Sequence, residues 1–395
     1  MRSAIWGFLL ICIACGSSEA PLVAVRDSAG VRIVTNSRPA WGDRQRWHVS
    51  HDPVLSLGSL DGDAAFSFER LSGVHALPGD QLTVLDEGAG QIRFFGLDGT
   101  PSSVFGRSGQ GPGEFQNLAF IGFSADSLWV FDGRQQRITV LDPGSGGFRV
   151  ARAAVDNAAL GPAGLLPDGS VLLAADLAFS SAIIDELPVG LRRFEAAYVR
   201  VGSDGSLEDT VLVTQGSERI LMHGPQTVQM LRPLLARSVS HAVRNAEILQ
   251  GSQDTYQIGA YSADGVLRTL IRRSDVDVRL DEALYDAAVE ERVLAAPEPA
   301  RPGLRALYEE QPKPESRPAY SRFLVDSEGF LWAQDFSYDG EASSWAVFDS
   351  EGVWLGAVEF PGRFRPTQVL EDRVFGVWRD ELEVEYARIY LLTRG

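Results

Sequence analysis

The stretch that decides the fold reads Leu71-Ser-Gly-Val-His-Ala-Leu77, Pro78-Gly-Asp80, Gln81-Leu-Thr-Val-Leu-Asp86. Two short segments rich in apolar residues flank a turn with glycine and aspartate, which is the pattern of a β-hairpin. The residues up to Gly106 add two more segments of the same kind. The stretch therefore predicts one four-stranded antiparallel sheet of about 40 residues, the size of a propeller blade.

This unit recurs along the chain. Leu118 to Val150 follows the same order, and Asp132 occupies the place of Asp86. Later units are looser but keep turns in which an acidic residue precedes a glycine: Gly169, Gly205, Gly265, Gly329 and Gly352. The 40 glycines and 20 prolines also favour a fold with many turns. Repeated short strands with such turns predict a β-propeller.

The two ends of the repeat region complete one another. Pro53 to Gly58 resembles the last strand of the first unit, so the fold begins with an outer strand. The last unit has only three predicted strands and lacks the fourth: Thr367 to Leu370, Arg373 to Trp378 and Glu383 to Leu392. Pairing the two ends removes the open sheet edges. We predict an all-β fold over residues 53–394, a six-bladed β-propeller of four-stranded antiparallel blades whose N-terminal strand closes the last blade.

One segment departs from the β pattern. Residues 280–296 carry apolar side chains at helical spacing and an acidic opposite face, which predicts an amphipathic helix. Pro297, Pro299 and Pro302 are expected to end it, before a proline-rich stretch that completes an insertion over residues 280–318. The insertion either packs on one propeller face, caps the central channel or docks a partner.

The N-terminus has the order of a secretory signal. Arg2 precedes an apolar run that is too short to span a membrane. Cys12-Ile-Ala-Cys15 resembles a bacterial lipobox, which predicts a signal peptide over residues 1–15 and lipid attachment at Cys15. A plain signal peptide is the alternative. Residues 16–52 then form a tether and N-terminal extension, and the protein is exported to the periplasmic side of the outer membrane or to the cell surface.

The segment Phe105 to Phe115, with its Gly-Gln-Gly-Pro-Gly core, resembles the connection between blades in NHL-type propellers. The repeated units resemble the six-bladed, TolB-like group of bacterial propellers. This resemblance implies a binding scaffold more often than an enzyme.

The charge balance restricts the partners. The chain has 36 basic and 53 acidic residues, a net charge of −17, and its field repels nucleic acid and anionic membrane surfaces. Arg192-Arg193 and Arg272-Arg273 are isolated and are interpreted as solvated turns. We expect a monomer that binds a protein or small ligand and contacts the membrane only through its lipid.

Two histidines are the candidate channel residues. His75 and His241 fall on the predicted inner strands of the first and fourth blades, which face each other across a six-membered ring. Asp86 and Asp132 are candidate neighbours that could bind a cation. The alternative is that the histidines are unrelated polar residues and that both aspartates close turns.

Two function classes fit these observations. The first is a non-catalytic binding module for a protein, glycan or small ligand. The second is a metal-dependent hydrolase or lyase similar to gluconolactonase or to peptidyl-amidating lyase, with Ca²⁺ or Zn²⁺ in the channel. Such enzymes need several convergent ligands, and only His75 and His241 are credible ones. No catalytic residue and no cofactor are predicted, which favours binding.

Overall fold

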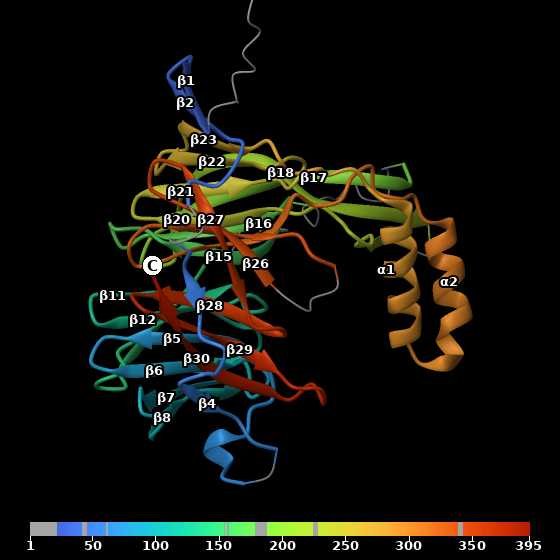
Figure 1. Ribbon diagram of the computed structural model, residues 1–395. Helices are drawn as coiled ribbons and strands as arrows, with labels where there is room; N and C mark the ends of the chain where they lie inside the picture. Colours follow the sequence, from blue (N-terminus) through green and yellow to red (C-terminus); the bar gives the residue numbers. More distant parts are fainter. Residues whose placement is uncertain are drawn as a thin grey trace, which may run out of the picture.

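The structure is a computed structural model that describes residues 22–41, 46–60, 62–153, 155, 158–177, 188–223, 228–338 and 343–395. Strands dominate it, and they form six antiparallel blades (Figure 1). The predicted six-bladed propeller is confirmed. The hydrophobic core lies between the blades, where the apolar faces of neighbouring sheets pack together.

Each blade contributes its first strand to the centre of the ring. The six inner strands are β5 (Leu71–Leu77), β11 (Leu118–Ser124), β15 (Ala159–Leu165), β20 (Ser240–Arg244), β24 (Tyr320–Val325) and β28 (Phe364–Leu370). Every inner strand contacts the inner strands of the two adjacent blades. The remaining strands lie outward from these in sequence order.

The outer parts of the blades follow the sequence. Blades one and two are completed by β6 (Gln81–Asp86), β7 (Gln91–Gly96), β8 (Pro101–Phe105), β12 (Ser127–Asp132), β13 (Arg137–Leu141) and β14 (Phe148–Arg152). Blades three and four are completed by β16 (Val171–Asp176), β17 (Gly190–Val201), β18 (Leu207–His223), β19 (Val228–Leu231), β21 (Glu247–Gly251), β22 (Gln257–Ser262) and β23 (Leu267–Arg273). Blade five adds β25 (Leu331–Asp335), β26 (Ser343–Phe348) and β27 (Trp354–Phe360).

The ring closes as predicted. The last blade consists of β28, β29 (Arg373–Arg379) and β30 (Glu385–Thr393), and β4 (Leu55–Leu57) pairs antiparallel with β30. The short strand β3 (His48–Val49) pairs with the other end of β30. Strands from both ends of the chain therefore share one blade, and the closed ring leaves no open edge at this point.

The turns and the connection between blades one and two match their sequence signals. Gly205, with φ of +87°, lies so close to blade two that an added Cβ would meet the carbonyl oxygen of Arg152 at 2.3 Å. In the glycine-rich connection, β9 (Arg107–Ser108) pairs with β10 (Glu114–Phe115). The backbone N–H of Gly111 donates to Glu114 at 2.7 Å. The glycines thus serve a tight loop between blades.

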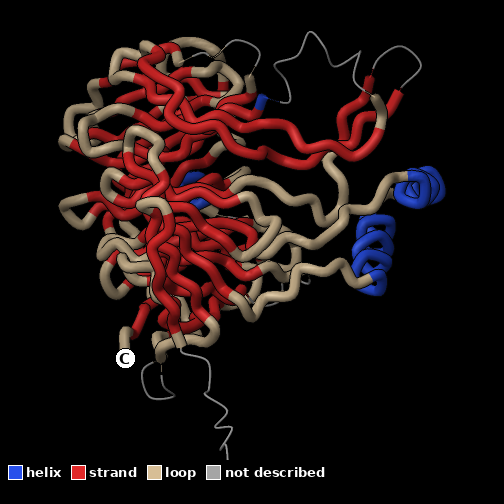
Figure 2. Tube along the Cα trace, turned by 90° about the horizontal axis from the view of Figure 1, so that it is seen from above, coloured by secondary structure: helices blue, strands red, loops and turns tan. Residues whose placement is uncertain are grey.

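The insertion contains two helices where one was predicted. The expected helix, α1 (Glu282–Ala295), begins at Asp281, whose side chain accepts from the N–H of Ala283. A second helix, α2 (Arg301–Glu310), follows and was missed. Pro302 was interpreted as a helix breaker, but it lies in the first turn of α2, where proline is tolerated because its missing N–H has no partner to lose. Figures 1 and 2 show both helices beside the propeller. Within the described residues, no helix has the length and hydropathy needed to cross a membrane.

Blade three extends beyond the ring. The strands β17 and β18 continue past the blade. There residues 190–193 of β17 pair with residues 218–221 of β18. Figure 2 shows these strands reaching out on the same side of the molecule as the helices. We call this extension the arm.

Residues 22–41 form a strap on the outside of the propeller. They include a hairpin of β1 (Val23–Ser28) and β2 (Val31–Asn36), and β2 pairs in parallel with β23 of blade four. The strap then crosses to blade five, where the N–H of Trp41 donates to the carbonyl of Leu355 at 2.7 Å. Trp41 lies directly on Gly356, which has no room for a Cβ.

Asn36 joins the strap to both blades. Its side chain is completely buried. Nδ2 donates to the carbonyl oxygens of Arg272 in blade four, at 3.1 Å, and of Gly352 in blade five, at 3.0 Å. Oδ1 accepts from the N–H of Trp354 at 2.9 Å. One amide therefore satisfies three backbone groups of two blades.

Replacing Asn36 is expected to destabilise the protein. The substitution Asn36→Leu leaves buried backbone groups unpaired and should lower the free energy of unfolding by about 2 kcal/mol or more. The control is Arg32→Gln in the same hairpin, since the pair of Arg32 with Glu351 is exposed and should contribute less than about 0.5 kcal/mol. Urea unfolding of both variants measures the difference. Equal losses would contradict the role given to Asn36.

Candidate functional site

A cavity of about 540 Å³ opens at one mouth of the central channel, where the inner strands end. All six blades contribute to it, among them β5 with His75, β11 with Phe120 and Phe123, and β20 with His241. The described residues that line it include no aspartate, glutamate, lysine or arginine. The lining side chains are therefore uncharged and mostly apolar, while polar atoms, including those of the backbone, make up about as much of the cavity surface as apolar ones.

His75 is buried in the wall of this cavity. Its side chain is 5% exposed and stacks on Phe120 with ring centroids 3.7 Å apart. Burial, and secondarily the charge of Arg365, lower its pKa from 6.5 to about 3. The imidazole is consequently neutral at pH 7. Within the described part of the chain, Nδ1 has no hydrogen-bond partner.

His241 lines the same cavity and is held on both ring nitrogens. Nδ1 lies 3.3 Å from the hydroxyl of Tyr198, and Nε2 lies 3.3 Å from the carbonyl oxygen of Pro162. A proton on Nε2 satisfies both contacts. Burial lowers the pKa of His241 as well. The structure thus brings His75 and His241 to one cavity as neutral imidazoles, one partnered and one with a free nitrogen.

Asp86 lies elsewhere, which corrects its proposed place in the channel. Its carboxylate is completely buried and accepts from the backbone N–H groups of Arg70 and Ala89, each at 3.2 Å. Arg93 forms an ion pair with it at 3.1 Å. These contacts join the start of blade one to the turn after β6. Asp86 is not among the residues that line the cavity.

Asp132 has the same role in blade two. It accepts from the N–H groups of Gln116, Arg134 and Gln135 at 2.8 to 3.0 Å. It too is absent from the cavity lining. Both aspartates close turns, as the alternative interpretation of the sequence held. Cys15, the candidate lipid-attachment residue, lies outside the described residues.

A metal site needs several ligating side chains close together. No three of their histidine, cysteine, aspartate and glutamate side chains gather as a group that could hold a metal ion.

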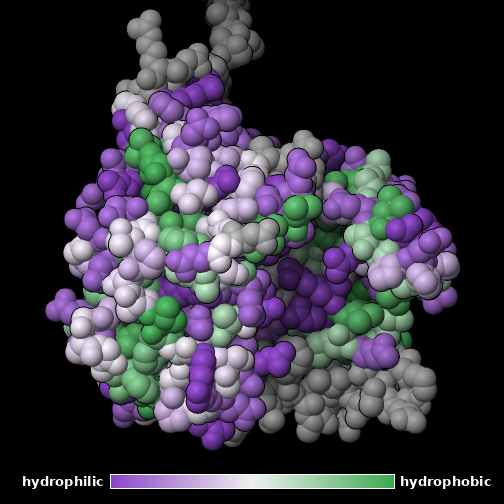
Figure 3. All heavy atoms as spheres, turned by 90° about the horizontal axis from the view of Figure 1, so that it is seen from below, coloured by the Kyte–Doolittle hydropathy of each residue, from purple (hydrophilic) through white to green (hydrophobic). Residues whose placement is uncertain are grey.

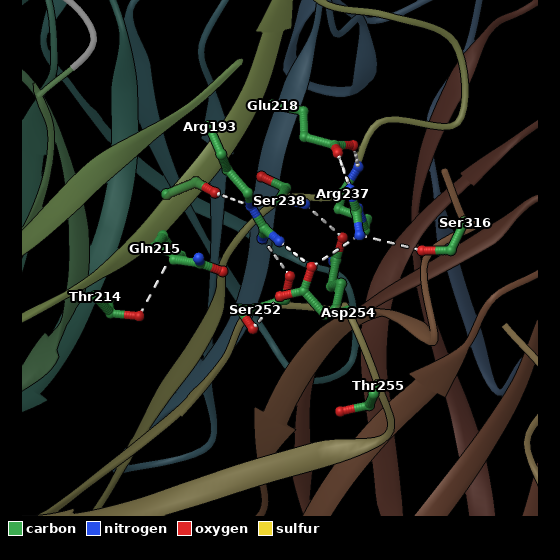
Figure 4. A network of polar contacts seen from close by, with 12 residues as sticks. Arg193, Thr214, Gln215, Glu218, Arg237, Ser238, Ser252, Asp254, Thr255 and Ser316 are labelled. Atoms are coloured by element: carbon green, nitrogen blue, oxygen red, sulfur yellow. Dashed lines mark hydrogen bonds and ion pairs between the residues drawn. The ribbon is translucent and has the colours of Figure 1, made fainter. Parts of the chain in front are cut away.

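The other mouth of the channel is chemically different. The arm, the two helices and the entry of the inner strands surround it, and Figure 3 shows a hollow with strongly hydrophilic residues between the propeller and the helices. A polar network ties the parts together (Figure 4). Asp254 of blade four accepts from Arg193 of the arm and from Arg237, and Arg237 also pairs with Glu218. Arg193 was wrongly interpreted as solvated.

Arg273, of the pair Arg272-Arg273, was also wrongly interpreted as solvated. It contacts Asp275 at 2.7 Å and Asp335 at 2.8 Å, and its guanidinium lies over the ring of Trp354 at 3.9 Å. Asp275 is a local partner, but sequence reasoning could not place Asp335 and Trp354, which lie in another blade. It also missed Arg322 and Arg365, which lie at the start of two neighbouring inner strands.

Comparison with known proteins places the chain by its fold. No family model matches the sequence, and no curated protein matches it. A solved structure of a DUF4221 family member from Bacteroides vulgatus is 9% identical with a TM-score of 0.52, covering 89% of this chain and 100% of that one. A Bacteroides fragilis protein assigned as exported is 11% identical with a TM-score of 0.50, covering 92% and 99%.

A virginiamycin B lyase from Staphylococcus aureus is 10% identical, with a TM-score of 0.44, and covers 88% of this chain and all of its own. Similarity at these identities concerns the fold alone. The fold and its axial cavity define the class of this protein: a six-bladed β-propeller with a ligand-sized opening at one end of its channel.

The buried histidine makes a specific contribution to acid sensitivity. In the unfolded chain His75 binds a proton below about pH 6.5, whereas in the folded protein it does so only below about pH 3. Folding stability therefore falls as the pH drops from 6.5 toward 3. Between pH 7 and pH 5 we expect His75 to account for about 2 kcal/mol of the loss. His75→Leu should flatten the pH dependence of urea unfolding by that amount, whereas the exposed His51→Leu should not.

Proposed function

We propose that this protein is an exported, lipid-anchored propeller that binds a small, uncharged and largely apolar ligand at the channel mouth lined by His75 and His241. The cavity itself carries the proposal. It takes residues from all six blades, measures about 540 Å³ and has no charged side chain among the described residues that line it. Pockets for small molecules have this size and combine apolar side chains with a few polar groups.

The free nitrogen of His75 supports a ligand with one hydrogen-bonding group. A buried polar atom without a partner costs roughly 1 to 3 kcal/mol. Nδ1 of His75 is such an atom, and the stacked ring of Phe120 holds it in place. Nδ1 itself is not accessible from the cavity in this orientation of the ring, so a ligand that donates to it, after the imidazole turns toward the cavity, would remove this cost.

Two observations support export and anchoring. The segment Cys12-Ile-Ala-Cys15 resembles a lipobox. The Bacteroides fragilis neighbour is assigned as exported. Separately, the connection from Phe105 to Phe115 supports an NHL-type class for the repeats. The lipid at Cys15 would hold the propeller at the periplasmic side of the outer membrane or at the cell surface.

The binding proposal is tested with indole, a neutral apolar molecule with one N–H donor. Calorimetric titration should show one binding site, and His75→Leu should weaken it at least fivefold, the effect of one lost hydrogen bond of about 1 kcal/mol. His51→Leu, at an exposed histidine, is the control. Absence of binding, or equal affinity in both variants, would contradict the proposal. Stoichiometric Zn²⁺ or Ca²⁺ binding lost in His75→Leu would instead favour the metal-dependent hydrolase or lyase.

The anchoring proposal is tested by expressing the full chain in a diderm host with labelled palmitate. The protein should carry the label and sediment with membranes. Cys15→Ala should lose the label and become soluble, whereas Cys12→Ala should keep it, because only Cys15 follows the small residue of the motif. Unlabelled wild-type protein would indicate a plain signal peptide.

A further inference from the structure

A second cavity, of about 570 Å³, lies between blades five and six on the side of the propeller that faces helix α1. Blades five and six form most of its wall, including Gln334, Arg363, Arg365 and Arg379, and Glu291 of α1 reaches it from the insertion. The cavity belongs to the hydrophilic side of the molecule described above and is separate from the one lined by His241.

Two of its arginines are paired within the protein. Arg379 contacts Glu385 at 2.7 Å and Glu383 at 3.5 Å. Arg363 lies 3.9 Å from Glu383 and donates to the carbonyl oxygen of Asp380 at 2.6 Å. Acidic side chains therefore account for both of these charges.

Arg365 and Arg322 lack such partners. Arg365 donates to the carbonyl oxygens of Leu71 and Ser72, at 2.7 and 3.1 Å. Arg322 donates through Nε to Gln334 at 3.0 Å. Among the described residues, no carboxylate lies within 4 Å of either guanidinium.

The two arginines lie on adjacent inner strands, Arg322 on β24 and Arg365 on β28. Both side chains are partly buried. Burial, followed by the charge of Arg365, lowers the pKa of Arg322 to about 10. Burial lowers the pKa of Arg365 as well; the more distant charges of Glu385 and Glu87 oppose this, and Arg379 adds to it. Two like charges removed from water are unfavourable unless an opposite charge joins them.

We propose that Arg365, which lines this cavity, binds the carboxylate or phosphate group of a small metabolite-sized anion, and that Arg322, held behind Gln334 of the cavity wall, adds its positive charge to the site. The guanidinium groups are planar, permanently charged and able to form paired hydrogen bonds with either group. Gln334 connects Arg322 to the cavity wall, and the apolar Phe364 and Val377 line the remainder. The surplus positive charge is local, since the whole chain carries −17 and repels anions elsewhere.

Arg322 is the better residue for a test. Arg365 links blade six to blade one through its two carbonyl contacts, so its removal also weakens the ring. Among the described residues, the side chain of Arg322 makes one hydrogen bond, to Gln334. Arg322→Gln therefore removes one charge of the site with little loss of packing.

The experiment titrates the purified protein with inorganic phosphate and, separately, with succinate at constant ionic strength. We expect one of the two to bind, and Arg322→Gln to weaken that binding about threefold or more, because it removes a positive charge directly behind the cavity wall. Arg268→Gln removes an exposed arginine of β23 and should bind as the wild type does. The preferred anion distinguishes a phosphate-bearing ligand from a carboxylate-bearing one.

A stability measurement separates binding from a structural role. Without anion, Arg322→Gln should unfold at the same temperature as the wild type or a higher one, because repulsion with Arg365 is relieved. A clear loss of thermal stability together with unchanged anion affinity would overturn the proposal, as would a wild-type protein that binds neither anion. Indole binding at the opposite mouth should not change in Arg322→Gln, so the two sites are tested independently.

Discussion

The pairing of β30 with β4 is the constraint on which the rest of the molecule depends. Without β4 the last blade would have three strands and an unpaired edge, and the ring would stay open. The inner strands would then not converge on a common axis. Because the cavity near His75 takes residues from every blade, it is assembled only when residues 55–57 join the last blade. Ring closure and site formation are therefore one event. This explains how weakly similar repeats can define a single pocket.

The two mouths of the channel are chemically opposite, although one set of strands forms both. One mouth is neutral because its histidines are buried and its described lining holds no charged side chain. The other is rich in arginine, and acidic residues compensate most of these charges. His75 lies between them, since it lines the neutral cavity while the charge of Arg365 acts on it. Occupation of the arginine site by an anion would weaken that influence.

The sequence predicts those features that depend on local spacing. Acidic–glycine turns such as Asp204-Gly205 mark the strands, and the helical spacing after Leu280 marks α1. Prediction from the sequence fails where the role of a residue depends on neighbours that are distant in the chain. Pro302 could not be distinguished from a helix breaker without the position of α2, and Asp86 differs from a cation ligand only through the N–H groups that surround it. His75 and His241 were found because inner strands can be recognised. Arg322 and Arg365 were not, since an uncompensated charge is visible only once its surroundings are known.

The strap has a mechanical consequence. A pull on residue 22 acts first on the hairpin, because Leu22 and Asn36 lie together at its open end: Val23 is paired with Asn36, and the carbonyl of Leu22 accepts from the N–H of Ser37. Such a pull therefore detaches β1 from β2 before it loads the parallel pairing of β2 with β23. Asn36, at this loaded end, fastens β2 to blades four and five. The outer strand β1 thus yields first, while β2 and the propeller behind it keep their contacts.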